Sequence, residues 1–431
     1  MLSLKGTIKE YGVLSEMVYK ENPIDYLTSG LLTDSYQLLK SQKNYLTGFY
    51  SVLLKNINTE EYVLVFRGTS DPFDISSWYG EKTPQYYDAV KFVSESISEF
   101  KIDKSNLTLT GHSLGGILTA QIGLEFGIKG YAYNPFGANL LSYDNFKEYS
   151  AILKDWAEHN IYTISYQDEG ALNGDILSNA LTNLAGEHLG SVILVFGKDA
   201  GWDFLTGHSI VNLNKYIEEY NNILKHFNSN ITYKELTEAY LSTAMVYKGK
   251  GYEKLNEEFK KLGVFNAAEN SLNLEVIIKD SSISSIFSNS SIPIENLYAL
   301  VYLNPFMVTN IDSPAYKELE KYKDEYSDNY IKDKTVMFKK ALDGKAAING
   351  IYFKDYESNL DLDTTQDFNG MYDEYHFGTN SNDTIEPIGT KISLDKNRIY
   401  ALGGDDHIKA PNGSNYIEAG SGNDTISRVF F

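Results

Sequence analysis

The chain of 431 residues contains no cysteine, which excludes disulfides, thiolate zinc sites and cysteine catalysis. Basic residues are also few, because 38 Lys and Arg stand against 58 Asp and Glu and leave a formal net charge of −20. That charge argues against a nucleic-acid partner and against steady adhesion to an anionic membrane. It suits a protein that binds multivalent cations through carboxylates.

Long hydrophobic runs are missing as well. The N-terminus has no basic stretch followed by an apolar one, so no secretory signal peptide is expected. The most apolar stretch, residues 297–308, is interrupted by Asn304 and Pro305 and is too short to span a membrane. We expect this stretch to form a buried strand or helix.

Apolar residues make up 42% of the chain, which is enough for a sizeable core, and the length favours two or three domains. Residues 1–227 alternate between strand-like and helix-like periodicity, which predicts an α/β domain with a mainly parallel sheet and flanking helices. Residues 228–375 form a middle region, helical or mixed, whose fold the sequence does not determine. Residues 376–431 change to Gly, Asn and Asp with isolated Ile.

The periodicity also predicts individual elements. Helices are expected over residues 1–42, 84–100, 114–126, 143–158, 210–224, 233–247 and 316–323. Strands are expected over residues 47–54, 62–66, 106–110, 129–133, 161–166 and 191–196.

Residues 111–116, GHSLGG, lie between a predicted strand and an apolar helix. They match the G-x-S-x-G nucleophile elbow in its expected context, and a plain glycine-rich turn is the alternative interpretation. Side chains in place of the glycines flanking Ser113 would collide with the neighbouring strand and helix. The turn would hold the Ser113 hydroxyl at a helix N-terminus, where backbone N–H groups point at developing negative charge.

Residues 64–69, LVFRGT, end a second β-run in a Gly-Thr turn upstream of the elbow. Acyl transfer needs two N–H donors aimed at the oxyanion. We expect one from Leu114, directly after the serine. Thr69 is the expected source of the other, through its N–H and its hydroxyl.

The FRGT sequence at residues 66–69, followed by GHSLGG at residues 111–116, resembles the class 3 lipases and the bacterial repeat-tailed lipases and phospholipases. The resemblance covers roughly residues 1–225. It implies an α/β-hydrolase fold and a triad in the order Ser, Asp, His that forms an acyl-enzyme. It also implies a lipid or phospholipid ester as substrate, met in transient contact with a membrane surface.

The acid of such a triad is expected where the strand after the elbow unit ends. Asp168 directly follows the predicted strand 161–166 and its Gln167, and it is the preferred candidate. Asp175 is the competitor, although an Asp in a longer polar turn has the simpler explanation of an Asx turn. Glu169 is a third possibility.

The base is expected after the acid and beyond the last core strand. His208 follows the predicted strand 191–196 and precedes the predicted helix 210–224, which is where the family places its histidine. His188 precedes that last strand and should lie elsewhere on the sheet. His112 is part of the elbow and is expected to pack under the turn.

Three consecutive nonapeptides, residues 401–409, 410–418 and 419–427, each have Gly at position four, Asp or Asn at position six and Ile at position eight. A further copy at residues 378–386 lacks the central Gly and is out of phase with them. The pattern resembles the nonapeptide calcium repeat of RTX proteins, which implies a parallel β-roll that binds structural Ca²⁺. A disordered tail would not keep Ile in phase.

Two nonapeptides complete one coil of such a roll, so residues 18 apart stack on the same edge. Asp406 and Asp424 are expected to face each other across one calcium site, with backbone carbonyls completing it. Asn415, on the opposite edge, has no full partner in phase, so a second site there should be weaker or absent. The expected metal ligands are Gly403, Asp405, Asp406, Ser421, Asn423 and Asp424.

Tails of this kind accompany secretion by the type I machinery, which agrees with the missing N-terminal signal. Only residues 428–431 follow the last repeat, which leaves little room for a C-terminal signal. The sequence therefore predicts a secreted, extracellular lipase or serine esterase of lipid degradation, of bacterial type. The alternatives are a phospholipase A and a calcium-dependent RTX adhesin or toxin with an inactive hydrolase-like domain.

Overall fold

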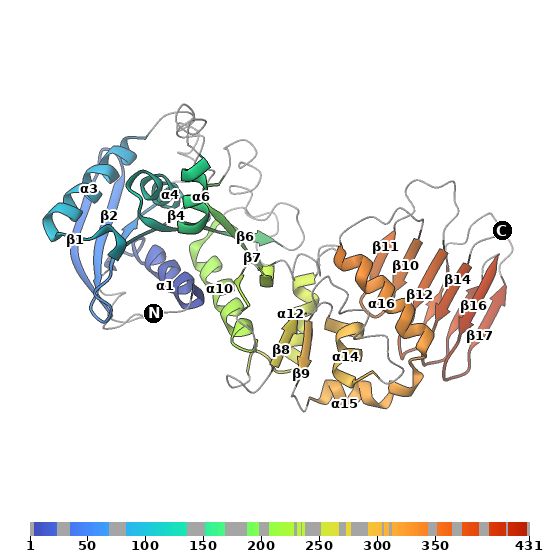
Figure 1. The fold of residues 1–431 in the computed structure, drawn as a ribbon. Helices are drawn as coiled ribbons and strands as arrows, with labels where there is room; N and C mark the ends of the chain where they lie inside the picture. Colours follow the sequence, from blue (N-terminus) through green and yellow to red (C-terminus); the bar gives the residue numbers. More distant parts are fainter. Residues whose placement is uncertain are drawn as a thin grey trace. The chain divides into compact units, whose positions relative to one another are not determined.

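The protein is described here by a computed structural model (Figure 1). The structure describes residues 4–23, 35–68, 83–135, 151–168, 188–197, 207–227, 231–233, 235–237, 251–266, 273–276, 292–303, 306–309, 313–343, 351–363, 373–387, 396–410 and 413–428. The chain divides into two compact units. Residues 1–221 with 232–237 form the first, and residues 222–231 with 238–431 form the second. The middle region and the repeat tail thus belong mostly to one unit.

The first unit is built on a seven-stranded sheet in the order β1-β2-β3-β4-β5-β6-β7. Antiparallel pairs join β1 (Tyr36–Asn44), β2 (Phe49–Asn56) and β3 (Tyr62–Phe66). Parallel pairs join β3 to β4 (Leu107–His112), β5 (Lys129–Tyr133), β6 (Ile161–Asp168) and β7 (Ser191–Gly197). The predicted α/β fold with a mainly parallel sheet is confirmed.

Helices flank this sheet (Figure 1). They are α1 (Leu4–Met17), α3 (Pro84–Phe100), α4 (Leu114–Phe126), α6 (Ala151–Asn160) and α10 (Ile210–Leu224). Because α4 is apolar on every side, it is buried from Leu114 to Leu124. It packs on β4 and β5, and α3 packs on β2 and α4. This packing fixes the junction between β4 and α4.

The prediction of one helix over residues 1–42 is wrong in its second half, because α1 ends at Met17 and residues 36–44 form β1. None of the β1 side chains is fully buried, so hydrophobic periodicity does not mark this edge strand. Its pairing with β2 defines it instead. Of the predicted helix 143–158, residues 151–158 lie in α6 and the rest falls outside the described residues, as does most of 233–247.

The second unit begins with short elements. They are α12 (Gly251–Lys261), β8 (Asn273–Val276), α14 (Ile294–Tyr298), the π-helix η4 (Ala299–Leu303), β9 (Phe306–Thr309), α15 (Pro314–Lys321), η5 (Lys323–Glu325) and α16 (Asp328–Asp343). β8 and β9 pair antiparallel. The apolar stretch 297–308 is largely buried, as predicted. Among the described residues, no helix is long and apolar enough to cross a membrane.

Within the described residues, eight further strands belong to the second unit. They are β10 (Ile351–Asp355), β11 (Leu360–Asp363), β12 (Asp373–Phe377), β13 (Thr384–Ile385), β14 (Lys396–Tyr400), β15 (His407–Ala410), β16 (Ser414–Glu418) and β17 (Thr425–Arg428). From β12 to β17 the strands alternate between two parallel sheets, an arrangement that we call the C-terminal coil (residues 373–428). Of the Ile residues at position eight of the repeats, Ile385 and Ile408 are fully buried between the sheets together with Ile399, Ile417 is partly buried against them, and Ile426 is 53% exposed.

The register of the coil corrects two details of the repeat prediction. The copy at 378–386 is not out of phase in space, because Thr384 pairs with His407 across a spacing of 23 residues. The additional residues fall between the two copies. Asn415 does have a partner in phase, since Asn397 lies 18 residues earlier and its Nδ2 donates to Asn415 Oδ1 at 2.9 Å.

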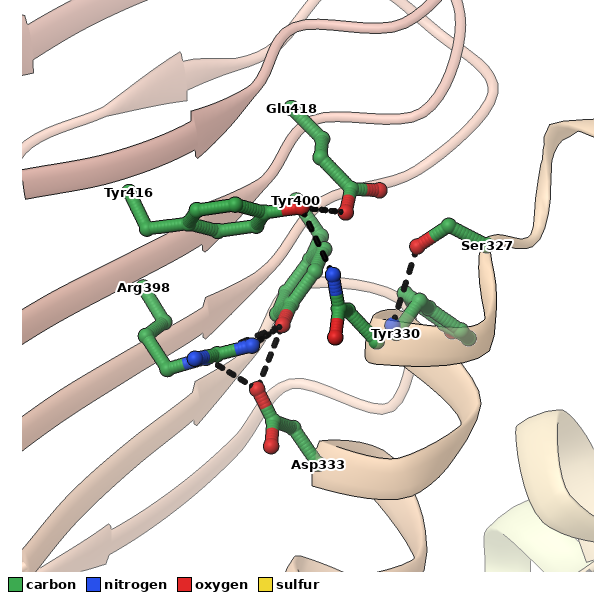
Figure 2. A network of polar contacts seen from close by, with 8 residues as sticks. Ser327, Tyr330, Asp333, Arg398, Tyr400, Tyr416 and Glu418 are labelled. Carbon is green, nitrogen blue, oxygen red and sulfur yellow. Dashed lines mark hydrogen bonds and ion pairs between the residues drawn. The ribbon is translucent and has the colours of Figure 1, made fainter. Parts of the chain in front are cut away.

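Helix α16 joins the coil through a shared polar and aromatic cluster (Figure 2). Asp333 forms an ion pair with Arg398 and accepts a hydrogen bond from the Tyr400 hydroxyl. The Tyr330 ring meets the Tyr400 ring edge-on, with centroids 5.7 Å apart. A buried ion pair between Lys334 and Asp355 lies on the same helix face, at 2.7 Å. The coil therefore shares its core with the helix that precedes it.

Candidate active site

The turn between β4 and α4 holds Ser113 in a strained backbone conformation, with φ 59° and ψ −124°. A non-glycine residue at positive φ is held there only when its surroundings dictate it. The Ser113 N–H donates to the Tyr133 carbonyl at 2.9 Å, and the Ser113 carbonyl accepts from Gly116 and Ile117 in the first turn of α4. These bonds tie the serine to both the sheet and the helix.

The glycines on either side of Ser113 are sterically required. A Cβ on Gly111 would lie 2.4 Å from the Gly115 carbonyl oxygen, and a Cβ on Gly115 would lie 2.2 Å from that of Phe66. Both distances are far below van der Waals contact with backbone atoms that cannot move aside. The predicted steric role of these glycines is confirmed.

The serine hydroxyl meets a histidine from a distant part of the chain. His208 Nε2 lies 2.8 Å from Ser113 Oγ, and both residues are buried. The two are 95 residues apart in sequence and belong to the same compact unit. A serine hydroxyl hydrogen-bonded to an imidazole is the arrangement that lets a base take up the hydroxyl proton during nucleophilic attack.

The backbone of His208 is held by two buried side chains. His112 Nε2 lies 2.7 Å from the His208 carbonyl oxygen, and Asn134 Nδ2 donates to the same oxygen at 3.2 Å. Asn134 follows β5 and is fully buried. Its Oδ1 accepts from the Tyr166 N–H of β6 at 2.8 Å. Asn134 therefore joins β6 to the segment that carries His208, a role that sequence reasoning missed.

Tyr19, two residues beyond α1, links the remaining parts of the site. Its hydroxyl accepts the Gly68 N–H at 3.0 Å and lies 3.0 Å from His112 Nδ1. Because His112 Nε2 faces a carbonyl, it must carry the ring proton, and Nδ1 then accepts from Tyr19. Burial holds the pKa of His112 well below its usual value, and the nearby His208 lowers it further, so the ring stays neutral.

The other predicted residues have the following places. Leu114 is the first residue of α4, so its N–H is a first-turn donor without an intrahelical acceptor. Asp168 ends β6, paired with Gly197 of β7, and its side chain lies outside the described residues. His188 comes just before β7, at the end of the parallel strands that lies away from Ser113. Thr69, Glu169 and Asp175 all lie outside the described residues.

A second candidate site lies along the edge of the C-terminal coil. The Asp406 N–H donates to Asp424 Oδ1 at 2.9 Å, and the Asp383 N–H donates to Asp406 Oδ1 at 2.8 Å. One residue earlier in each of these two repeats, the Asn423 N–H donates to Asp405 Oδ1 at 2.8 Å. The edge is thus a ladder of three aspartates, Asp383, Asp406 and Asp424, of which the 18-residue spacing predicts only the last two.

The central aspartate of this ladder, Asp406, lacks a hydrogen-bond donor for one of its carboxylate oxygens among the described residues. Asp406 is buried, and its Oδ2 has no hydrogen-bond partner among the described residues. Burial, with the negative charges of Asp383, Asp424 and Asp405, raises the pKa of Asp406 to about 6. Gly403 and Ser421 lie on the same edge and pair with each other in a parallel bridge. Across the described ranges, no three His, Asp or Glu side chains converge as a metal site.

The first unit is therefore an α/β domain with a serine at an elbow turn, hydrogen-bonded to a histidine. Among solved structures, the chain is similar to a lipase from Rhizopus microsporus var. chinensis, with 15% identity over 45% of this chain and 75% of that one, at a TM-score of 0.34. Lipase II from Rhizopus niveus has 14% identity over 44% and 80%, at 0.34. Lip2 lipase from Yarrowia lipolytica has 12% identity over 44% and 78%, at 0.32. No family model and no curated protein matches the chain.

Proposed function

We propose that this chain is a lipolytic serine hydrolase that cleaves carboxylic esters of lipids through an acyl-enzyme. The observation that carries the proposal is the 2.8 Å contact between Ser113 Oγ and His208 Nε2 on a strained elbow. An isolated serine hydroxyl is a poor nucleophile at neutral pH and needs such a base. The catalytic residues we assign are Ser113, Asp168 and His208.

The proposed reaction runs in two halves. His208 takes the Ser113 proton as Oγ attacks the ester carbonyl, and it returns that proton to the departing alcohol. His208 then activates a water that releases the acid. Asp168 orients the imidazole and stabilises its cationic form. The N–H groups of Leu114 and Thr69 stabilise the oxyanion in both halves.

The substrate class is tested by hydrolysis of a panel of triglycerides and phospholipids, with the products identified by mass spectrometry. Release of fatty acid from triglycerides supports a lipase, and release from phospholipids alone makes the enzyme a phospholipase A. Failure to cleave any ester, including soluble short-chain esters, would contradict the proposal. The inactive, adhesin-like alternative would then hold.

We also propose that the aspartate ladder of the coil binds structural calcium, as in the RTX-type β-roll. The orphaned Asp406 Oδ2, buried next to Asp424, is the kind of oxygen that a bound cation would satisfy. Carboxylates from Asp406 and Asp424 would hold the ion together with oxygens of Gly403, Asp405, Ser421 and Asn423. Because extracellular modules bind calcium at about 10⁻⁴–10⁻³ M, the coil would complete its folding after secretion, outside the cell.

Removal of calcium should unfold residues 396–428 of the C-terminal coil while the first unit stays folded. Without the ion, the ladder crowds carboxylates among carbonyl oxygens, so the free energy of calcium binding contributes directly to folding. Amide hydrogen exchange of residues 396–428 should be fast in chelator and slow in millimolar calcium. Asp406→Ala and Asp424→Ala should remain fast in both conditions. Equal protection in chelator and in calcium would refute the metal assignment.

Tyr19→Phe should slow the reaction without weakening substrate binding. The change removes the hydroxyl that accepts the Gly68 N–H and contacts His112, so the loop before Thr69 and the elbow lose a shared anchor. Losing one such buried bond is worth about 1.4 kcal/mol, which lowers kcat about tenfold with KM unchanged. Tyr36→Phe is the matched control, because its hydroxyl bonds to Glu10 at the opposite end of the sheet. Equal losses in both variants would point to a general effect on stability.

A further inference from the structure

Two large apolar side chains project from the turn between β1 and β2. Leu46 is 97% exposed and Tyr45 is 83% exposed. Single exposed apolar residues are common on protein surfaces, but two adjacent ones that are almost fully in water at the tip of a hairpin are not. Lys43 precedes them, and its Nζ lies 4.6 Å from the centroid of the Tyr45 ring.

The turn that carries these side chains is firmly braced. Asp88 of α3 accepts hydrogen bonds from Asn44 Nδ2 at 3.0 Å and from Thr47 Oγ1 at 2.6 Å. Gln85 Nε2 donates to the Thr47 carbonyl at 2.8 Å, and the Leu46 N–H donates to Asn44 Oδ1 at 3.0 Å. A turn with this many bonds has little freedom to fold its apolar tip back onto the protein.

The strand register places this tip at the same end of the strands as the elbow. β2 runs antiparallel to β3, so its first residues lie beside the last residues of β3, with Ser51 opposite Phe66. β3 runs parallel to β4, with Phe66 opposite Gly111. The Arg67 N–H donates to the Tyr50 carbonyl at 3.0 Å, beyond the end of β3. The hairpin tip and Ser113 therefore lie at the same end of the sheet, with β3 between β2 and β4.

We propose that the tip formed by Tyr45 and Leu46 inserts into the surface of a lipid aggregate and holds the edge that carries Ser113 against it. This inference rests on the proposed function, because it names the physical form in which the ester is met. Leu46 would enter the acyl region, while the Tyr45 ring and the Lys43 ammonium stay at headgroup level. Tyr87, 61% exposed between Gln85 and Asp88, adds aromatic surface beside the brace.

The net charge of −20 indicates which kind of lipid surface the tip would bind. An anionic bilayer would repel the chain, so the tip fits a zwitterionic or neutral interface on which apolar insertion provides the attraction. Two side chains give only weak, reversible binding, which suits an enzyme that must leave the surface again.

The test separates binding to an interface from catalysis. Leu46→Ser and the double variant Tyr45→Ser with Leu46→Ser are compared with the unchanged protein. Ile57→Ser is the matched control, because Ile57 is 50% exposed in the β2–β3 turn at the opposite edge of the sheet. Sedimentation with phosphatidylcholine vesicles measures binding. Hydrolysis of a soluble short-chain ester and of an emulsified long-chain ester measures catalysis.

The double variant should bind vesicles at least about tenfold more weakly and lose a similar factor on the emulsified ester, as expected for the burial of two apolar side chains. Its rate on the soluble ester should be unchanged, and Ile57→Ser should match the unchanged protein throughout. Equal vesicle binding by all variants would overturn the inference. So would a dimer that the double variant abolishes without a change in vesicle binding. Absence of soluble-ester hydrolysis in the unchanged protein would overturn the proposed function alone, because vesicle binding is measured independently.

Discussion

Ser113→Ala should lower ester hydrolysis by about 10⁶-fold while leaving the fold intact, because it removes the nucleophile itself. His208→Ala should be equally severe. The two side chains meet at 2.8 Å and act as one unit, so their losses should not add. The double variant should therefore be hardly slower than either single one. Hydrolysis of a soluble ester under saturating conditions measures all three rates.

Two control variants test whether the loss of activity is specific to Ser113 and His208. Ser51→Ala changes another buried serine, whose hydroxyl donates to the Val65 carbonyl at 2.8 Å. His159→Ala changes an exposed histidine in α6. Both controls should keep near-normal rates. A Ser113→Ala protein with near-normal activity would overturn the assignment. Additive losses in the double variant would mean that His208 works outside the serine unit and is not the base.

The second large effect concerns the acid. Asp168→Asn should lower kcat by about 10⁴-fold, because a neutral amide no longer holds the imidazole in the required tautomer or stabilises its cation. The backbone of Asp168 ends β6, beside Gly197 at the end of β7, and β7 is the strand that precedes His208 in the chain. An acid at this position lies at the same end of the parallel strands as Ser113. Kinetics on a soluble ester provide the measurement.

Asp175→Asn is the matched comparison for the acid, since it makes the same chemical change in the competing candidate. It should alter the rate by less than about tenfold, as expected for a residue outside the catalytic unit. If Asp175→Asn is the damaging change and Asp168→Asn is not, the acid is Asp175, and the assignment of the residue at the end of β6 is wrong. A similar comparison with Glu169→Gln covers the third candidate.

Local patterns in the sequence were sufficient to predict much of the first unit. The helices α3, α4 and α10 and the strands β3 and β5 have the predicted bounds, because each combines strong periodicity with a clear boundary signal. The elbow was predictable for a different reason. No other residue fits at positions 111 and 115, so the two glycines in the sequence directly indicate the tight turn.

Features that depend on distant partners were not predictable. Tyr19 is one of 34 tyrosines, and only the folded chain brings its hydroxyl to Gly68 and His112. Asn134 reads as a turn residue before a proline, although its amide joins β6 to the segment that carries His208. Asp383 lies in the copy that breaks the 18-residue spacing, whereas strand pairing tolerates the longer spacing of 23 residues.

The most direct test of the central claim is labelling of the intact protein with a fluorophosphonate probe, followed by mapping of the modified residue by mass spectrometry. Such probes phosphonylate a serine whose hydroxyl is activated by a neighbouring base. We predict one labelled residue, Ser113, with labelling lost in Ser113→Ala and strongly slowed in His208→Ala. Labelling at a different serine, or none in the unchanged protein, would contradict the account.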